Sequence, residues 1–315
     1  MCDDRKMKQK LVAVVGPTAS GKTRLAIEIA KRFNGEIVGA DSMKIYKYMD
    51  IGTAKPTAEE RAEAAHHMID FLEPDVQYSV ADYTKMAHEV IGEIASRGKL
   101  PVMCGGTGLY INSVVDDVTF GEIETDYELR AELQRIAETE GTQKLLNMLG
   151  EFDPESAAKL HPNNQRRIVR AIEFYRTTGV TISAHQKMTK EKESRYEPVM
   201  LSVAWDRQEL YDRINRRVDI MINDGLFDEV RELMDRGYTQ RLNSMQGIGY
   251  KEVIDCIEGR MSYEETVELI KQSSRRYAKR QLTWFKRDTR IHWVSAENAV
   301  EEAVEFVKTE LGGQE

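Results

Sequence analysis

The chain has 315 residues, enough for one large domain or two of ordinary size, and 41% of them are hydrophobic and 31% charged. This composition is typical of a soluble globular protein and excludes a fibrous or largely disordered chain. No run of about 18 apolar residues is present, and the first ten residues are polar, so we expect a cytoplasmic protein without a membrane span. Three scattered cysteines, Cys2, Cys104 and Cys256, are too few for a disulfide framework or a zinc cluster.

The charge is distributed unevenly. A net charge of -8 would by itself argue against a polyanionic partner. Residues 271–290, however, contain eight basic residues and a single acid, Asp288, so this segment carries +7 and the remainder of the chain -15. A nucleic-acid partner therefore stays open.

The first predicted element is a short buried strand, Leu11–Val15, and the second is an amphipathic helix over Lys22–Phe33. Between them the sequence reads Gly, four residues, Gly, Lys, Thr from Gly16 to Thr23, which is the phosphate-loop pattern in the context that it requires. Its glycines let backbone amides point at phosphate oxygens, and the start of the helix favours an anion. Lys22 would neutralise the terminal phosphates and the Thr23 hydroxyl would bind a magnesium ion.

A second apolar strand, Glu36–Ala40, ends at Asp41, and Met68–Leu72 is predicted as a third strand. Because the second strand should neighbour the first, Asp41 is expected beside the phosphates. There it could act as a general base or hold magnesium through water. It could equally cap the N-terminus of a following helix, and the sequence leaves both interpretations open.

A helix over Val80–Arg97 precedes another buried strand, Leu100–Cys104, which runs into Gly105–Gly108 with a single hydroxyl at Thr107. Strands that alternate with helices predict an α/β fold of P-loop NTPase type, a parallel sheet with helices on both faces. The three strand exits should then meet at one ligand site. The glycine-rich exit could also be an ordinary flexible loop. No acid follows this strand, which weakens the case for an ATP hydrolase.

Between about Phe120 and Glu197 the strand signal disappears and the composition favours short helices. We expect an inserted helical domain at 120–197, within a core made of residues 1–119 and 198–315. A strand should return just after Pro198, followed by amphipathic helices as far as Phe285, a last short strand and a terminal helix.

Three basic clusters are candidates for binding. The first, Gln165, Arg166, Arg167 and Arg170, occupies about one helical turn. The second, 271–290, interleaves its charges with Tyr277, Trp284 and Phe285, which suits folded RNA, although a solvated helix face with Trp284 and Phe285 in the core is the alternative. The third contains Arg213, Arg216 and Arg217, which could bind a diphosphate or pair with Asp212 and Asp219.

Six sequence blocks in this order resemble the bacterial tRNA dimethylallyltransferase family, also called tRNA isopentenyltransferase. They are Gly-Pro-Thr-Ala-Ser-Gly-Lys-Thr (16–23), Gly-Ala-Asp-Ser-Met (39–43), Asp-Ile-Gly-Thr-Ala-Lys-Pro (50–56), Gly-Gly-Thr-Gly-Leu-Tyr (105–110), Arg-Arg-Ile-Val-Arg-Ala-Ile-Glu (166–173) and Gln-Gly-Ile-Gly-Tyr-Lys-Glu (246–252). The resemblance covers nearly the whole chain.

This resemblance implies transfer of a dimethylallyl group from dimethylallyl diphosphate to N6 of adenosine 37 in tRNA, with Mg²⁺ as cofactor. Asp41 would be the general base, and Thr107 would position substrate groups near the leaving diphosphate. The implied diphosphate-binding residues are Gly16, Thr18, Ala19, Ser20, Gly21, Lys22, Thr23, Arg217 and Arg213. The implied tRNA-binding residues are Asp41, Ser42, Met43, Lys44, Thr107, Arg130, Gln165, Arg166, Arg167, Arg170, Gln246, Gly247, Gly249, Tyr250 and Lys251, and Arg275 and Arg280 extend the set into the basic segment.

Two other classes fit the phosphate loop, a nucleotide or small-metabolite kinase and a nucleic-acid-binding ATPase. The identity of the donor separates them from a prenyltransferase. Family members commonly have glutamine where this chain has Lys44, so the chain departs from the family pattern at this implied tRNA contact. Nothing in the sequence demands a partner subunit, and we expect a monomer.

Overall fold

The computed structural model describes residues 8–118, 126–191 and 193–312, and these divide into two compact units. The first unit consists of residues up to Val115 together with those from Arg195 onward, and the second runs from Asp116 to Ser194. The predicted start of the insert at 120 lies in 119–125, outside the described residues.

The first unit contains a six-stranded, wholly parallel sheet in the order β3-β2-β4-β1-β5-β6. Its strands are β1 (Gln9–Val15), β2 (Gly35–Gly39), β3 (His66–His67), β4 (Leu100–Gly105), β5 (Tyr196–Ala204) and β6 (Ile291–Ser295). Its helices are α1 (Lys22–Arg32), α2 (Ala58–Glu63), α3 (Val80–Ser96), α4 (Gly108–Val115), α10 (Arg207–Asn223), α11 (Leu226–Asp235), α12 (Tyr250–Ile257), α13 (Tyr263–Phe285) and α14 (Ala299–Glu310), with a 3-10 turn, η2, at Ser244–Gln246. The predicted fold class is confirmed.

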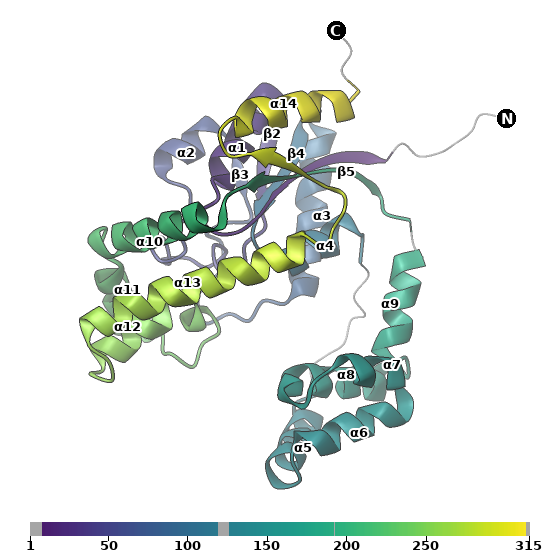
Figure 1. Cartoon of the computed structure of the whole chain (residues 1–315). Helices are drawn as coiled ribbons and strands as arrows, with labels where there is room; N and C mark the ends of the chain where they lie inside the picture. Colours follow the sequence, from purple (N-terminus) through teal and green to yellow (C-terminus); the bar gives the residue numbers. More distant parts are fainter. Residues whose placement is uncertain (1–7, 119–125, 192, 313–315) are drawn as a thin grey trace, which may run out of the picture. The chain divides into compact units, whose positions relative to one another are not determined.

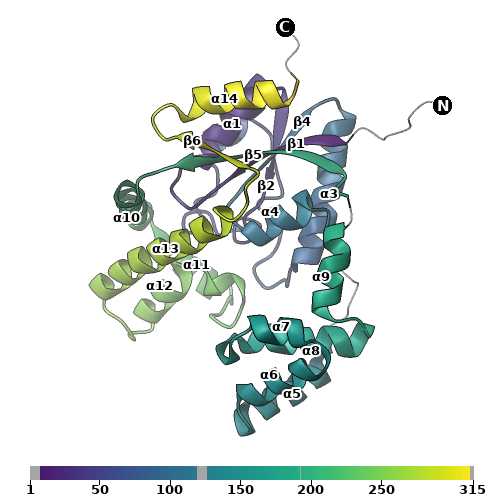
Figure 2. The same cartoon turned by 45° about the vertical axis from the view of Figure 1, so that its right-hand side comes forward.

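Alternate residues of each strand face opposite sides of the sheet. In β1, Leu11, Ala13 and Val15 pack with α3 and α4, whereas Val12 and Val14 pack with α1 and α14. Figures 1 and 2 show these two helix pairs on opposite faces of the sheet. Because both faces are covered, residues Leu11–Val15 of the central strand are fully buried, and the site must lie at an end of the strands.

A third cluster of buried residues joins the segment after β2 to helices α10–α13. Ile45 and Met49 pack there against Val218, Leu226 and Tyr250. This packing brings helices α10–α13, from later in the sequence, next to the segment that carries Asp41.

Two predicted strands differ in the structure. The prediction of a strand at Met68–Leu72 is wrong, because β3 consists of His66–His67. Met68 and Asp70 have φ angles of 58° and 60°, and these positive values end the extended backbone. The strand expected to start after Pro198 includes that proline. β6 pairs with β5 only from Met200 onward, so Pro198 lies where one edge of β5 is open and its missing amide breaks no ladder on that side.

The second unit is helical and has its own core, with Leu133, Leu145, Leu149, Ile168 and Ile172 buried in it. Its helices are α5 (Tyr127–Thr139), α6 (Thr142–Phe152), α7 (Pro154–Lys159), α8 (Gln165–Thr178) and α9 (Ile182–Glu191), with a 3-10 turn, η1, at Pro162–Asn164. None of the helices in the described part of the chain is long and apolar enough to cross a bilayer.

Candidate active site

The phosphate loop joins β1 to α1. Gly16 and Gly21 have φ angles of 141° and 85°, in the region that favours glycine. Gly21 is the N-cap of α1 and supplies no side-chain acceptor, so the first amides of that helix are available to an anion. Lys22 folds over the loop and donates from Nζ to the carbonyl oxygen of Pro17 at 2.9 Å.

Neighbouring side chains bind the outer carbonyls of this loop. The indole nitrogen of Trp205 donates to the carbonyl of Ser20 at 3.0 Å, and Nε of Arg213 donates to that of Ala19 at 2.9 Å. The Arg213 guanidinium also lies 4.2 Å from the centre of the Trp205 ring. These contacts fix the loop conformation, so Arg213 already acts on the loop before any ligand is considered.

Asp41 and Thr107 come together where β2 and β4 end. The amide of Ser42 donates to Oγ1 of Thr107 at 3.0 Å, and the amide of Thr107 donates to the carbonyl of Ala40 at 3.2 Å. Asp41 accepts from the amide of Met43 at 2.9 Å through Oδ1. Turns, not a helix, follow Asp41, so the helix-cap interpretation is wrong. In the described part of the chain no cation forms a salt bridge with its carboxylate, which leaves that carboxylate available to a substrate.

The glycines after β4 serve close packing. A Cβ atom on Gly105 would lie 1.9 Å from the carbonyl oxygen of Ala40, and one on Gly106 would lie 2.2 Å from Nε2 of Gln281. That same nitrogen donates to the carbonyl of Gly106 at 2.9 Å, and Oε1 of Gln281 accepts from the amide of Thr18 at 3.0 Å. One glutamine therefore ties the two strand exits together, and the flexible-loop interpretation is wrong.

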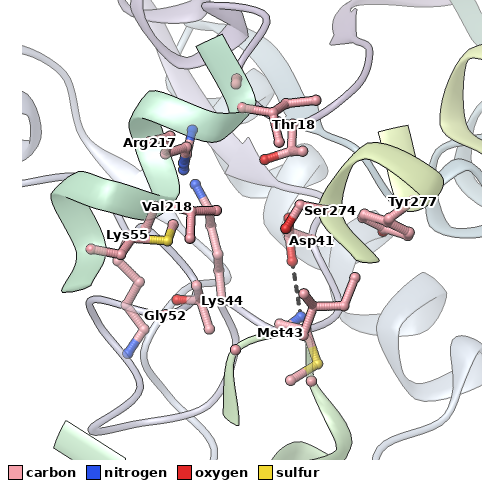
Figure 3. Close-up of a pocket in the computed structure, with 18 of the residues that line it drawn as sticks. Thr18, Asp41, Met43, Lys44, Gly52, Lys55, Arg217, Val218, Ser274 and Tyr277 are labelled. Atoms are coloured by element: carbon pink, nitrogen blue, oxygen red, sulfur yellow. Dashed lines mark hydrogen bonds between the residues drawn. The ribbon is translucent and has the colours of Figure 1, made fainter. Parts of the chain in front are cut away.

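A cavity of about 890 Å³ opens over these strand exits. Its walls come from the phosphate loop, the segment after β2, the 52–55 loop, α10, residues 246–251 and α13. In Figure 3, Arg217 and Lys44 lie on one side of the cavity, and Asp41 and Tyr277 lie on the other.

The lining of the cavity is strongly basic, although the chain as a whole is acidic. Its acidic residues are Asp41 and Glu60. Its basic residues are Lys22, Arg24, Lys44, Lys55, Arg213, Arg216, Arg217, Lys251 and Arg280. Such an excess of positive charge in a hollow attracts a polyanion.

The innermost cations lower one another's proton affinity. Burial, with the nearby charges of Lys44 and Arg217, lowers the pKa of Lys22 to about 8. Burial also lowers the pKa of Lys44 and of Arg217. The buried Nε atom of Arg217 has no hydrogen-bond partner among the described residues. Burial disfavours the charged forms of these groups, and none of them has a salt-bridge partner among the described residues, so a bound diphosphate would stabilise their charged forms.

The alternative for the third basic cluster, pairing with Asp212 and Asp219, is wrong. Asp219 accepts instead from Lys271 at 2.6 Å, and Asp212 accepts from Gln208 at 3.0 Å. Arg216 is exposed and donates to the backbone carbonyl of Asp212 at 3.4 Å. The α10 arginines are therefore not neutralised by the acids of their own helix.

The segment 246–251 splits into two parts. Gln246, Gly247, Gly249 and Lys251 line the cavity. Tyr250 is buried and donates from its hydroxyl to Glu229 at 2.7 Å, which places it behind the cavity wall. Tyr250 thus packs within the protein, and its contact with tRNA stays a prediction.

The basic segment 271–290 also divides. Lys271, Arg275 and Arg290 form ion pairs with Asp219, Glu268 and Asp288. Arg280 is exposed, lines the cavity and lies 5.5 Å from the centre of the Tyr277 ring. Phe285 is in the core as the alternative interpretation expected, whereas Trp284 is 43% exposed. Arg280 therefore faces the cavity, whereas the guanidinium of Arg275 is already occupied.

In the helical unit the predicted contact residues have unequal surroundings. Arg130 and Arg170 both donate to the fully buried Glu173, from Nε at 2.9 Å and from a terminal nitrogen at 2.9 Å. Gln165 donates to Gln134 at 2.9 Å. The guanidinium groups of Arg166 and Arg167 are exposed and form no ion pair within the described residues, so these two are free to meet a phosphate.

No sequence pattern indicated the residues that hold the 50–55 loop at the cavity rim. One carboxylate oxygen of Glu229 accepts from the amides of Asp50 and Ile51, at 2.8 and 2.7 Å, and the other accepts from that of Gly52 at 3.1 Å. Lys55 is buried and pairs with Asp50 at 2.6 Å. Periodicity shows Glu229 only as a polar position on a helix, so no local signal could reveal this role.

Comparison with known proteins places the chain beside transferases that act on tRNA. The sequence profile of the family described as IPP transferase matches residues 44–288. A tRNA dimethylallyltransferase of Caldanaerobacter subterraneus is 53% identical over 91% of this chain and 92% of its own length. One of Oceanobacillus iheyensis is 47% identical over 98% of both chains.

Solved structures agree with this result. The tRNA isopentenylpyrophosphate transferase of Bacillus halodurans superimposes with a TM-score of 0.73 at 44% identity, over 96% of this chain and 97% of that one. A eukaryotic dimethylallyltransferase acting on tRNA gives a TM-score of 0.81 at 26% identity, over 98% of this chain and 80% of that one.

Proposed function

This chain belongs to the IPP transferase family, and from that premise we propose that it transfers the dimethylallyl group from dimethylallyl diphosphate to N6 of adenosine 37 in the anticodon loop of tRNA, releasing diphosphate. One observation supports this most strongly. A phosphate loop with unneutralised cations and an unpaired carboxylate, Asp41, open into the same cavity. Both halves of the proposed reaction, an anionic leaving group and a deprotonated nitrogen, require such an arrangement.

In the proposed reaction the adenine N6 forms a bond to the first carbon of the prenyl group while the bond from that carbon to oxygen breaks. The electron pair of the broken bond remains on the diphosphate, so negative charge grows beside Lys22 and Arg217. The exocyclic nitrogen is a poor nucleophile because its lone pair is delocalised into the ring. We assign Asp41 to accept the N6 proton, which becomes more acidic as the new bond forms. Thr107 holds the backbone after Asp41 through Ser42.

The diphosphate would be held by the loop amides, Lys22 and Arg217. Thr18, Ala19, Gly21, Lys22 and Thr23 line the cavity, while Gly16 and Ser20 are buried behind it. Arg213 contributes indirectly, because its Nε binds the loop carbonyl at Ala19. The arrangement stabilises the leaving group more than the substrate, since its charge is greatest after departure.

The residues present are compatible with a magnesium ion. Thr23 follows the loop lysine and its side chain lines the cavity. Among the described residues, no group of three or more His, Cys, Asp or Glu side chains could hold a metal by itself. Magnesium commonly keeps several waters and binds through one or two protein ligands and substrate phosphates, which such a site allows. When bound, it would add positive charge at the diphosphate.

The target adenine must leave the stack of the anticodon loop to reach Asp41, and an unpaired loop nucleotide makes this less costly. The cavity lining offers an aromatic ring, Tyr277, and cations, Lys251 and Arg280, suited to a base and its phosphates. In the helical unit, Arg166 and Arg167 are our candidates for further phosphate contacts. All residues that line the cavity come from one unit of a single chain, so the proposed reaction needs no second subunit. We further propose that the protein acts in the cytoplasm, where its tRNA substrate is.

The identity of the donor substrate distinguishes the proposed prenyl transfer from the alternatives. Radiolabelled dimethylallyl diphosphate and an unmodified anticodon stem-loop are incubated with the full chain, with and without magnesium, and label in the RNA is counted. A stem-loop with guanosine at position 37 is the control and should remain unlabelled. Consumption of ATP without transfer of label would instead indicate a kinase or an ATPase.

A further inference from the structure

Three cations converge on the part of the cavity next to the phosphate loop. Lys22 comes from the loop, Lys44 from the segment after β2, and Arg217 from α10. Figure 3 shows the side chains of Lys44 and Arg217 directed toward one another. Two positive groups in a partly desolvated site repel each other, so the arrangement costs free energy unless an anion lies between them.

Among the described residues, no such anion contacts Lys44. The described residues provide no hydrogen bond or ion pair to its ammonium group; its backbone carbonyl, by contrast, accepts from the amide of Asp70 at 2.9 Å. Two other lysines nearby are each paired with acids. Lys55 binds Asp50 and Asp70 at 2.6 and 2.7 Å, and Lys47 binds Glu73 at 2.8 Å. Lys44 therefore differs from these two paired lysines.

The nearest carboxylates do not fill this role. Asp41 is within electrostatic range of Lys44, but one of its oxygens accepts from the amide of Met43 and no salt bridge joins the two side chains. Glu60 also faces the cavity, and its carboxylate accepts from the amide of Thr57 at 3.0 Å in the capping box of α2. Both acids are bound to their own backbone turns.

We propose that Lys44 binds the diphosphate of the prenyl donor and the departing pyrophosphate, beside Lys22 and Arg217, and does not bind tRNA. The inference rests on the proposed function. It changes the role that the sequence alone implied, because the family resemblance placed Lys44 among the tRNA contacts. The attraction of a bound polyanion to each of the three cations offsets the repulsion among them.

This role has a consequence for magnesium. With three protein cations and the loop amides at the diphosphate, the protein itself supplies much of the charge that a metal would otherwise supply. Pyrophosphate should then bind measurably when metal is removed, and this residual binding should depend on Lys44.

The test is titration calorimetry of inorganic pyrophosphate into the full chain in EDTA. Lys44→Gln and Lys44→Met should each weaken binding at least about tenfold, since a hydrogen bond to a charged group in a sheltered site is lost. Lys44→Arg, which keeps the charge, should stay within about threefold. Lys47→Gln is the matched control, because Lys47 lies three residues further along, is paired with Glu73 and is not part of the cavity lining, and it should bind like the wild type.

The same variants are titrated with a fluorescent anticodon stem-loop, and Lys44→Gln should bind it within about twofold of the wild type at fixed salt. Unchanged pyrophosphate affinity in both neutral variants, or a loss confined to the stem-loop, would overturn the inference. A wild-type protein that binds pyrophosphate through Lys44 but transfers no prenyl group would refute the proposed function alone. Transfer by the wild type with no effect of Lys44 on pyrophosphate would refute this inference alone.

Discussion

The cavity and the helical unit both contain arginine-rich sequence, but the structure uses those charges in opposite ways. In the cavity, Arg217 and its neighbouring lysines lack counter-ions among the described residues, and burial lowers their pKa values. In the helical unit, Arg130 and Arg170 bind the two carboxylate oxygens of the buried Glu173. A basic cluster in a sequence is therefore not yet a binding site, because pairing with a buried acid decides whether the charge is available.

The largest expected effect concerns the acid that the cavity leaves unpaired. Asp41→Asn keeps the shape and the bond from the Met43 amide but cannot accept a proton, so kcat should fall about a thousandfold. Pyrophosphate affinity should remain within a few-fold, because the base acts in the transition state. Single-turnover transfer assays measure this effect. Glu60→Gln is the control, since glutamine preserves the capping box, and unchanged transfer by Asp41→Asn would remove the proposed base.

The second expected effect concerns the paired arginines. Glu173→Gln leaves Arg130 and Arg170 without their buried anion and should destabilise the helical unit by about 3 kcal/mol. Burial alone would raise the pKa of Glu173, but its bonds to these arginines lower it. The glutamate therefore stabilises the fold above its unfolded pKa, and that stability is lost as the pH falls through the lower folded value.

Urea unfolding, monitored by hydrogen exchange within residues 126–191, measures this loss of stability. Glu155→Gln removes an exposed partner of Lys159 and Lys187 in the same unit and should cost much less stability than Glu173→Gln, because exposed ion pairs are screened by water. Equal losses in the two variants would show that the buried pairing is not special.

The third expected effect concerns the cavity cations, which have no counter-ion among the described residues. Arg217→Gln removes a cation whose Nε atom has no partner and should weaken pyrophosphate binding about thirtyfold, with little loss of stability. Calorimetry and a thermal melt together measure the two quantities. Arg207→Gln, exposed on the same helix and not part of the cavity lining, should alter neither. A stability loss without a binding loss would place Arg217 with the structural arginines.

The fourth expected effect follows from the pKa of about 8 for Lys22. A bound diphosphate favours the protonated ammonium. Below that pH Lys22 is already protonated, so its contribution to the pyrophosphate affinity should not change with pH. Above it, binding takes up a proton, and affinity should fall by up to about tenfold per pH unit. Pyrophosphate titrations at several pH values measure the slope. Lys22→Arg, which stays charged, should lose this part of the dependence, and identical profiles would contradict the shift.

The smallest expected effect concerns the free arginines of α8. Arg166→Gln with Arg167→Gln should reduce the slope of log affinity against log salt for the stem-loop by about 1.5, if each binds one phosphate. Arg176→Gln, exposed near the end of the same helix, is the control. An unaltered slope would assign Arg166 and Arg167 to a solvated surface.

Local pattern was sufficient for much of this molecule. The phosphate loop, the strands at Leu11–Val15 and Leu100–Cys104 and the helical character of the insert follow from periodicity and glycine placement, which depend on neighbouring residues. The failures also have local causes. Met68 and Asp70 adopt positive φ, and Pro198 lies within a strand whose one edge is open, and neither condition can be read from hydropathy.

The sequence by itself determined the parallel fold, the family and the set of residues near the strand ends, because these depend on spacing along the chain. Only the tertiary structure decided which charges are free. Glu173 neutralises Arg130, 43 residues earlier, and Glu229 holds the backbone at 50–52, across separations that no local pattern spans. Pairing is a property of three-dimensional distance, and it therefore distinguishes the unpaired Lys44 from the paired Lys47 three residues further along.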